Sequence, residues 1–162
     1  MARDHRRPPP PQPAANDKVV IRRIPAEHIK DCNDGSGRRR VSKAAFSASS
    51  RKVDPEEGMS VDLWSQLVED GIDPESAEYA PDAEVLMTLR VSDIEELGLT
   101  LVRRPITGNS AHCNVLQIKS SQRNKLLKRA EWLRRPDDVI KALRWSRFVG
   151  QVGGQVKVYS GC

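Results

Sequence analysis

The sequence predicts an α+β protein, with a small sheet of about three to five strands and helices packed mainly on one side of it. Short apolar runs of strand length, bounded by Pro, Gly, Asn or Asp, indicate the sheet. Segments with apolar residues at helical spacing lie between and after these runs. The strands do not alternate regularly with helices, which argues against a doubly wound parallel sheet.

Length and the two ends divide the chain into three parts. Its 162 residues fit one domain with extended ends. Residues 1–17 contain a proline run and lack the apolar stretch of a secretory signal, which predicts a disordered leader. We expect a single domain over residues 18–148 and a flexible tail over residues 149–162.

The first part of the domain is predicted to be extended. Residues 18–24 fit a strand that Pro25 ends, and a short connection follows. The Asp34-Gly35 pair is typical of a tight turn, because glycine supplies a backbone conformation that other residues avoid. Residues 38–46 then fit either a partner strand or an exposed arm, followed by a polar loop.

Two helices are predicted next. The first spans residues 59–71, where Ser60 can cap the start and Gly71 can end it. The apolar residues at helical spacing in this segment are Val61, Trp64, Leu67 and Val68. The second helix starts at Asp73-Pro74 and is short, because Pro81 soon follows.

A buried strand is predicted at residues 84–91, followed by a short helix. Ser92 and Glu95 have the spacing of a capping box, in which each side chain bonds the other residue's backbone N–H. Gly98 ends this helix.

Residues 97–118 are predicted to be the centre of the fold. They contain strands at residues 99–103 and 111–118, joined by a turn with Pro, Gly and Asn. Beyond them, Ser121 is expected to cap the longest helix, at residues 122–135.

A last amphipathic helix is predicted to begin at Asp137 and to run to about Phe148. Pro136 separates it from the preceding helix.

The composition limits where the protein works. No run of about 18 apolar residues exists in the sequence, so we expect no membrane-spanning helix and no membrane partner. The three cysteines are Cys32, Cys113 and Cys162. Their odd number and wide spacing predict no disulfide framework and a reducing cytoplasm.

Charge is strongly segregated along the chain. Residues 1–53 carry 13 Lys/Arg and 5 Asp/Glu, whereas residues 54–100 carry 1 and 14. Residues 119–162 are basic again, with 11 Lys/Arg and 3 Asp/Glu. The basic segments could present a face to an anionic partner, or they could neutralise the acidic segment on folding, and we favour neutralisation.

His112 is the leading candidate for acid–base chemistry, because it lies near the start of a predicted central strand. The alternative is a buried histidine bonded to a backbone carbonyl or to Asn114. In an enzyme, Ser42 or Ser60 could assist His112. Residues that could bind an anionic substrate are Arg22, Arg23, Arg39 and His28.

We predict no metal site and no cofactor. His112 and Cys113 would point to opposite faces of a strand, and no close Cys or His pair compensates. No phosphate-binding glycine loop is present.

Two basic clusters could contact nucleic-acid phosphates. The candidate residues are Arg38, Arg40, Lys119, Arg123, Lys125, Lys128 and Arg129. Aromatic residues make up only 4% of the chain, which argues against stacking of single-stranded bases.

The order of three segments resembles a loose group of small bacterial proteins. The segments are Arg22-Arg23-Ile24-Pro25 with His28, Val41-Ser42 and Ala45-Phe46 leading to Met59-Ser60-Val61, and Leu97-Gly98-Leu99 leading to Pro105 and Ala111-His112. The resemblance covers about residues 19–133. It implies a compact bacterial cytoplasmic protein and brings no catalytic residues with it.

Three functions remain open from the sequence. The first is a non-catalytic binding or accessory module whose partner is another protein, held by complementary charge. The second is an enzyme acting on a nucleotide-like or phosphorylated substrate, with His112 as acid–base. The third is a nucleic-acid-binding protein that uses the basic clusters.

Overall fold

The computed structural model describes residues 18–48, 58–141, 148–152 and 155–159. The predicted leader, most of the polar loop after residue 48 and part of the last predicted helix lie outside the described residues. The mixed α and β content agrees with the predicted class.

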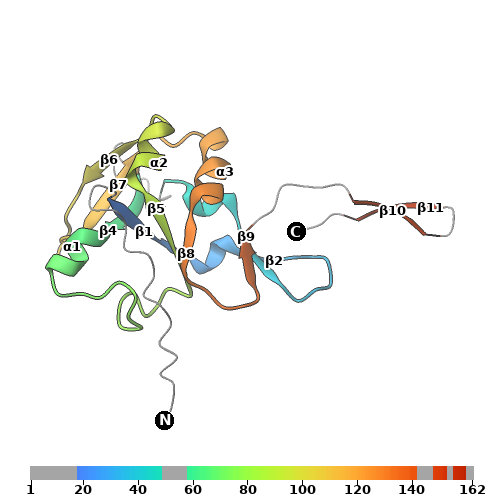
Figure 1. The fold of residues 1–162 in the computed structure, drawn as a ribbon, viewed down its shortest axis with the longest axis horizontal. Helices are drawn as coiled ribbons and strands as arrows, with labels where there is room; N and C mark the ends of the chain where they lie inside the picture. The colour runs from blue at the N-terminus through green and yellow to red at the C-terminus, as the bar shows by residue number, and fades with distance from the viewer. Residues whose placement is uncertain (1–17, 49–57, 142–147, 153–154, 160–162) are drawn as a thin grey trace, which may run out of the picture.

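A six-stranded antiparallel sheet forms the centre of the molecule, in the order β6-β7-β4-β1-β5-β8 (Figure 1). Its strands are β1 (Val19–Ile24), β4 (Met59–Leu63), β5 (Val85–Arg90), β6 (Thr100–Arg103), β7 (His112–Leu116) and β8 (Glu131–Arg134). The strands predicted near residues 18–24, 84–91, 99–103 and 111–118 are confirmed. The sheet is larger than predicted, because β4 and β8 come from segments predicted as helix.

The helix predicted from residue 59 was wrong in its first half. Met59, Val61 and Leu63 alternate into the core with the period of a strand, and β4 pairs with both β1 and β7. The helix α1 (Trp64–Glu69) begins only afterwards. Ser60 therefore lies inside a strand and is no helix cap.

Close backbone approach fixes the start of β4. A Cβ atom at Gly58 would lie 2.5 Å from the carbonyl oxygen of Val115 in β7. Only glycine fits this position without moving the neighbouring backbone.

Two other helix boundaries differ from prediction. The segment that starts at Asp73 forms turns, with no helix up to Pro81. The helix α2 (Val91–Glu96) begins two residues early, with Arg90 in place of Ser92 at the N-cap position, so Ser92 lies inside the first turn and does not act as the predicted cap.

The longest described helix, α3 (Ser120–Arg129), is shorter than predicted. Ser121 does not cap it; the Gln122 side chain accepts a 2.7 Å hydrogen bond from the Lys119 backbone N–H. Ala130 is extended (ψ 138°), and the chain continues as β8, which pairs with β5 at the sheet edge. Pairing with β5 thus outweighs the helical preference of residues 131–134.

A small second sheet lies beside the first, in the order β2-β3-β9. Its strands are β2 (Ile29–Asp31), β3 (Arg39–Val41) and β9 (Val139–Lys141). Residues 38–46 thus form a partner strand followed by the 3-10 turn η2 (Lys43–Phe46), and η1 (Ala26–His28) precedes β2. Residues 139–141, predicted as helix, pair with β3 instead.

Near the carboxyl end, β10 (Phe148–Val152) and β11 (Gln155–Tyr159) pair as antiparallel strands.

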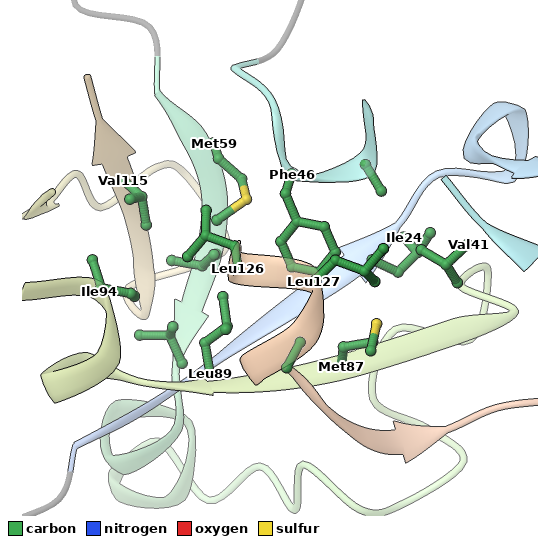
Figure 2. Close-up of a cluster of buried hydrophobic side chains, with 14 of the residues drawn as sticks. Ile24, Val41, Phe46, Met59, Met87, Leu89, Ile94, Val115, Leu126 and Leu127 are labelled. Atoms are coloured by element: carbon green, nitrogen blue, oxygen red, sulfur yellow. The ribbon is translucent and has the colours of Figure 1, made fainter. Parts of the chain in front are cut away.

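Apolar clusters cover both faces of the large sheet, so the prediction of helices mainly on one side is not confirmed. The larger cluster lies beneath α2, α3 and η2, where Phe46, Leu126 and Leu127 pack onto Met59 and Met87 (Figure 2). The smaller cluster joins Ile21 and Leu86 of the sheet to Leu67 of α1 and to Tyr79. Side chains of β1 alternate between the two clusters.

Cys32 is disulfide-bonded, whereas Cys113 is a buried free thiol. The number and spacing of the cysteines had predicted no disulfide framework, and the described residues contain one disulfide-bonded cysteine, Cys32.

Candidate functional site

A buried carboxylate, Asp62, lies at the centre of the sheet. Its neighbours Val61 and Leu63 belong to the larger apolar cluster, whereas Asp62 contacts Tyr79 of the smaller one. Only 3% of the residue is exposed. A carboxylate that is removed from water to this degree needs several hydrogen-bond donors to remain charged.

Three side chains from separate parts of the chain supply these donors. Arg23 of β1 donates from Nε and Nη2 to Oδ2 at 3.0 and 2.7 Å. Tyr79 donates its hydroxyl to Oδ2 at 2.6 Å, and Asn109 donates Nδ2 to Oδ1 at 2.7 Å. Asp62 therefore joins β1, the segment before β5 and the β6–β7 turn.

The Tyr79 phenol is held as a hydrogen-bond donor. Burial, followed by its bond to Asp62, raises the pKa of Tyr79 well above its usual range. The Arg23 guanidinium lies over its ring, 5.3 Å from the centroid. This arrangement positions the side chains and leaves no deprotonated phenol for chemistry near neutral pH.

His112 is held by its own hairpin. Its Nδ1 lies 2.7 Å from the carbonyl oxygen of Arg104. Because a carbonyl only accepts, Nδ1 carries the proton and Nε2 is the acceptor when the ring is neutral. His112 faces Asp62 across the β4–β7 pair, yet the donors on Asp62 are Arg23, Tyr79 and Asn109. The sequence had offered a buried histidine bonded to a backbone carbonyl as the alternative to acid–base chemistry; the carbonyl bond is present, and His112 is half-buried.

The other enzyme candidates meet elsewhere, beneath η2. Arg22 is 7% exposed and donates from Nε to Ala45 O at 3.0 Å and from Nη1 to Ser60 O at 2.9 Å. Burial lowers the pKa of Arg22 to about 10. The Arg22 side chain thus links η2 to β4 through two backbone carbonyls.

Ser42 and His28 border the same region. The Ser42 hydroxyl accepts from Ala44 N at 3.3 Å and so caps η2, while Ser42 N donates to His28 O at 2.8 Å. Burial lowers the pKa of His28, and the nearby charges of Arg22 and Lys30 lower it further. Arg22, His28 and Ser42 are therefore neighbours, and Ser60 joins them only through its backbone carbonyl, because its side chain lies on the same face of β4 as Asp62.

Arg39, proposed as an anion contact, is already paired with acidic residues. It lies 2.6 Å from Glu84 and 2.6 Å from Asp138. Arg23 is likewise paired, with Asp62.

Several of the predicted nucleic-acid residues are ion-paired or partly buried. Arg129 pairs with Asp93 at 3.2 Å and Glu96 at 2.9 Å, and Arg38 lies 3.5 Å from Asp34. Arg123 lies one turn before the buried Leu126 and Leu127, on the inner side of α3. Lys119, Lys125 and Lys128 are exposed, whereas Arg40 is half-buried.

Two hollows open beside the sheet. One of about 420 Å³ lies between α2 and the ends of β4, β6 and β7, with Cys113 in its wall. Burial raises the pKa of the Cys113 thiol, which makes it a poor nucleophile. The other, of about 480 Å³, lies beside Arg23, between residues 23–26 and 80–84, and we call it the β1–β5 groove.

Sequence reasoning missed Asp62, Tyr79 and Asn109. Asp62 was hidden in a segment predicted as helix, where it would have been one more exposed acid. Its signal was an acidic residue between apolar neighbours at alternate positions, Val61 and Leu63.

Searches against known proteins gave no relative to compare with this site: the chain matches no protein-family model, no curated protein and no solved structure. Among the described residues, no group of three or more His, Cys, Asp or Glu could hold a metal ion. None of the described helices is long and apolar enough to cross a membrane.

Proposed function

We propose that this protein is a non-catalytic binding module whose partner is another protein. The proposal is supported above all by how the candidate catalytic side chains are used. Ser42 caps η2, His112 bonds the Arg104 carbonyl, and Asp62 is saturated by its donors. These side chains hold segments of the fold together and are divided between two regions, which does not favour a shared catalytic centre.

The rival enzyme would use His112 as acid–base on a phosphorylated substrate. Two of the anion contacts proposed for it, Arg23 and Arg39, already pair with carboxylates. A variant that removes the basicity of His112 and keeps a polar side chain of similar size separates the two functions, and His112→Gln is such a variant.

The test has two arms in the source cells. Crosslinking of the tagged chain followed by mass spectrometry identifies a partner, and the complex is then rebuilt from the purified proteins. We expect a defined stoichiometry, the same affinity for the native chain and His112→Gln, and full cellular function of His112→Gln. A folded His112→Gln chain that binds the partner but behaves like a gene deletion would support the enzyme instead.

Nucleic-acid binding is the remaining alternative. Because Arg38 and Arg129 are ion-paired and Arg123 lies on the inner side of α3, we expect the protein to pass through heparin and duplex-DNA columns at low salt. Retention that falls steeply with salt, and that Lys125→Glu with Lys128→Glu removes, would favour nucleic acid over a protein partner.

A further inference from the structure

The β1–β5 groove is formed where two paired strands diverge. β1 and β5 pair from Val19 opposite Arg90 to Ile24 opposite Val85. Pairing stops there because Pro25 has no N–H group to donate. The chain of residues 25–26 then turns into η1, while residues 80–84 approach β5 from the other side, and a space of about 480 Å³ lies between them.

The wall formed by residues 80–84 is held by two arginines, Arg134 and Arg39. Arg134 of β8 donates to the carbonyl oxygens of Ser76, Tyr79 and Ala80 at 2.7, 2.8 and 3.2 Å. Glu84 is paired with Arg39 at 2.6 Å. Ala80 is held at φ +47°, a conformation that costs about 1 kcal/mol for a residue with a Cβ. A groove with fixed walls loses little freedom when a ligand binds.

The floor of the groove offers hydrogen-bond donors in a fixed position. Arg23 is bound to Asp62 through Nε and Nη2 and lies against the Tyr79 ring. Its side chain is 47% exposed. Its bonds to Asp62 use Nε and Nη2, so Nη1 is the guanidinium nitrogen that does not bind this carboxylate. Because Asp62 balances the charge of Arg23, these N–H groups suit a neutral carbonyl oxygen.

The rim of the groove carries an unbalanced negative charge. Glu84 is neutralised by Arg39, but Asp82 is exposed and forms no ion pair with any described residue. This charge disfavours nucleic acid and other polyanions, and it favours a partner with an amine or guanidinium group. The other lining residues, Pro25, Ala26, Pro81 and Ala83, are small and apolar.

We propose that the β1–β5 groove binds an extended, lysine- or arginine-containing peptide segment of a partner protein. A backbone carbonyl of the peptide accepts from Arg23 Nη1, its basic side chain pairs with Asp82, and small apolar residues contact the two prolines. This inference rests on the proposed function, because it names the part of the partner that the module holds.

The experiment is an NMR titration of the full-length, ¹⁵N-labelled protein. Two capped hexapeptides with the same apolar residues are added in turn, one with lysines and one with glutamates. We expect the lysine peptide to shift the amide signals of Arg23, Ala26, Asp82, Ala83 and Glu84, and the glutamate peptide to leave them unchanged.

Asp82→Asn should weaken binding of the lysine peptide by about two- to fivefold, the effect of losing one exposed ion pair. Glu69→Gln, which removes an exposed charge from α1, is the matched control and should leave the affinity unchanged. The proposal is overturned if neither peptide shifts the groove signals, if both do so equally, or if Asp82→Asn and Glu69→Gln behave alike.

The two proposals can fail separately. A native partner that binds the Asp82→Asn chain as tightly as the native chain would overturn the groove and leave the binding module intact. Binding of the lysine peptide in the groove, together with loss of cellular function in a folded His112→Gln chain that still binds it, would instead overturn the non-catalytic module.

Discussion

Asp62 shows how a single residue can fix the arrangement of three segments. Its carboxylate collects the Arg23 guanidinium, the Tyr79 hydroxyl and the Asn109 amide from β1, the segment before β5 and the β6–β7 turn. Each donor is replaceable by water only if the site opens, since Asp62 is 3% exposed. The network is therefore strong evidence for a specific structure, whatever its net contribution to stability.

Tyr79→Phe should lower the free energy of unfolding by about 1–3 kcal/mol, because it removes one donor from a buried carboxylate and keeps the ring. Urea unfolding followed by circular dichroism measures the change, with Glu69→Gln as an exposed control. A variant as stable as the native protein would show that the Tyr79–Asp62 bond, 2.6 Å long, contributes nothing.

Ala80 carries strain that glycine would relieve. Ala80 has φ +47°, so Ala80→Gly removes a conformational cost of about 1–2 kcal/mol. Glycine also raises the entropy of the unfolded chain, which offsets part of this gain, so we expect a net stabilisation of about 0.5–1 kcal/mol. Ala83→Gly, at a neighbouring site without positive φ, should destabilise by a similar amount. Thermal unfolding of both variants gives the comparison. Stabilisation of both variants, or destabilisation of both, would refute the strain at Ala80.

At the scale of elements, edge strand β8 stabilises a segment without regular structure. Arg134 bonds three carbonyls of the chain between Ser76 and Ala80, which forms turns only. This contact replaces the backbone bonds that a helix or strand would supply. The segment after Asp73 therefore keeps a defined conformation without forming the predicted helix.

Arg134→Met should increase hydrogen exchange in residues 72–84 by about tenfold or more, since about 1.4 kcal/mol of local stability corresponds to a factor of ten. Exchange in β1 and β4 should change much less. Arg38→Met, which removes an exposed arginine whose partners are Asp34 and Ser36 in its own turn, is the control. Unchanged exchange in residues 72–84 would mean that the Arg134 bonds do not hold the segment.

At the scale of the whole molecule, the charge segregation is used largely for internal pairing. The basic flanks meet the acidic middle in the pairs Arg23–Asp62, Arg39–Glu84 and Arg129 with Asp93 and Glu96. Neutralisation on folding, favoured from the sequence, is confirmed at these contacts. The net charge of +5 is unchanged by this pairing, but fewer of the 27 basic side chains remain free to contact an anionic partner.

Stability should fall in acid. Hydrogen bonds from Arg39 hold the pKa of Asp138 below its usual range, and those from Ser110 and Gln66 do the same for Asp70. A lowered folded-state pKa gives stability that is present above the unfolded pKa of about 3.9 and is lost as pH falls through the folded value. Melting temperatures between pH 7 and about pH 3 should show this loss.

The fall in melting temperature with decreasing pH should be shallower in Asp138→Asn and Asp70→Asn than in the native chain. Asp137→Asn, at an exposed neighbour of Asp138, should retain the native slope. Identical slopes in all variants would assign the acid sensitivity to other groups.

The cysteines test the cellular location. Cys32 is disulfide-bonded and Cys113 is a buried free thiol, whereas the cysteine count had predicted a reducing cytoplasm. Alkylation of the non-reduced, denatured protein should label Cys113 and spare Cys32, as read by peptide mass spectrometry. Full labelling of Cys32 in protein taken from its source cells would instead support the cytoplasm.

The sequence alone determined the α+β class, the confirmed strands of the sheet and the β6–β7 hairpin, because apolar runs and turn residues act locally. Only the tertiary structure decided that residues 59–63 and 131–134 are strands, since cross-strand partners far along the chain outweigh their helical spacing. The same holds for the site. His112 was visible as a residue type, but Asp62 gained its importance from Arg23, Tyr79 and Asn109, which only folding brings together.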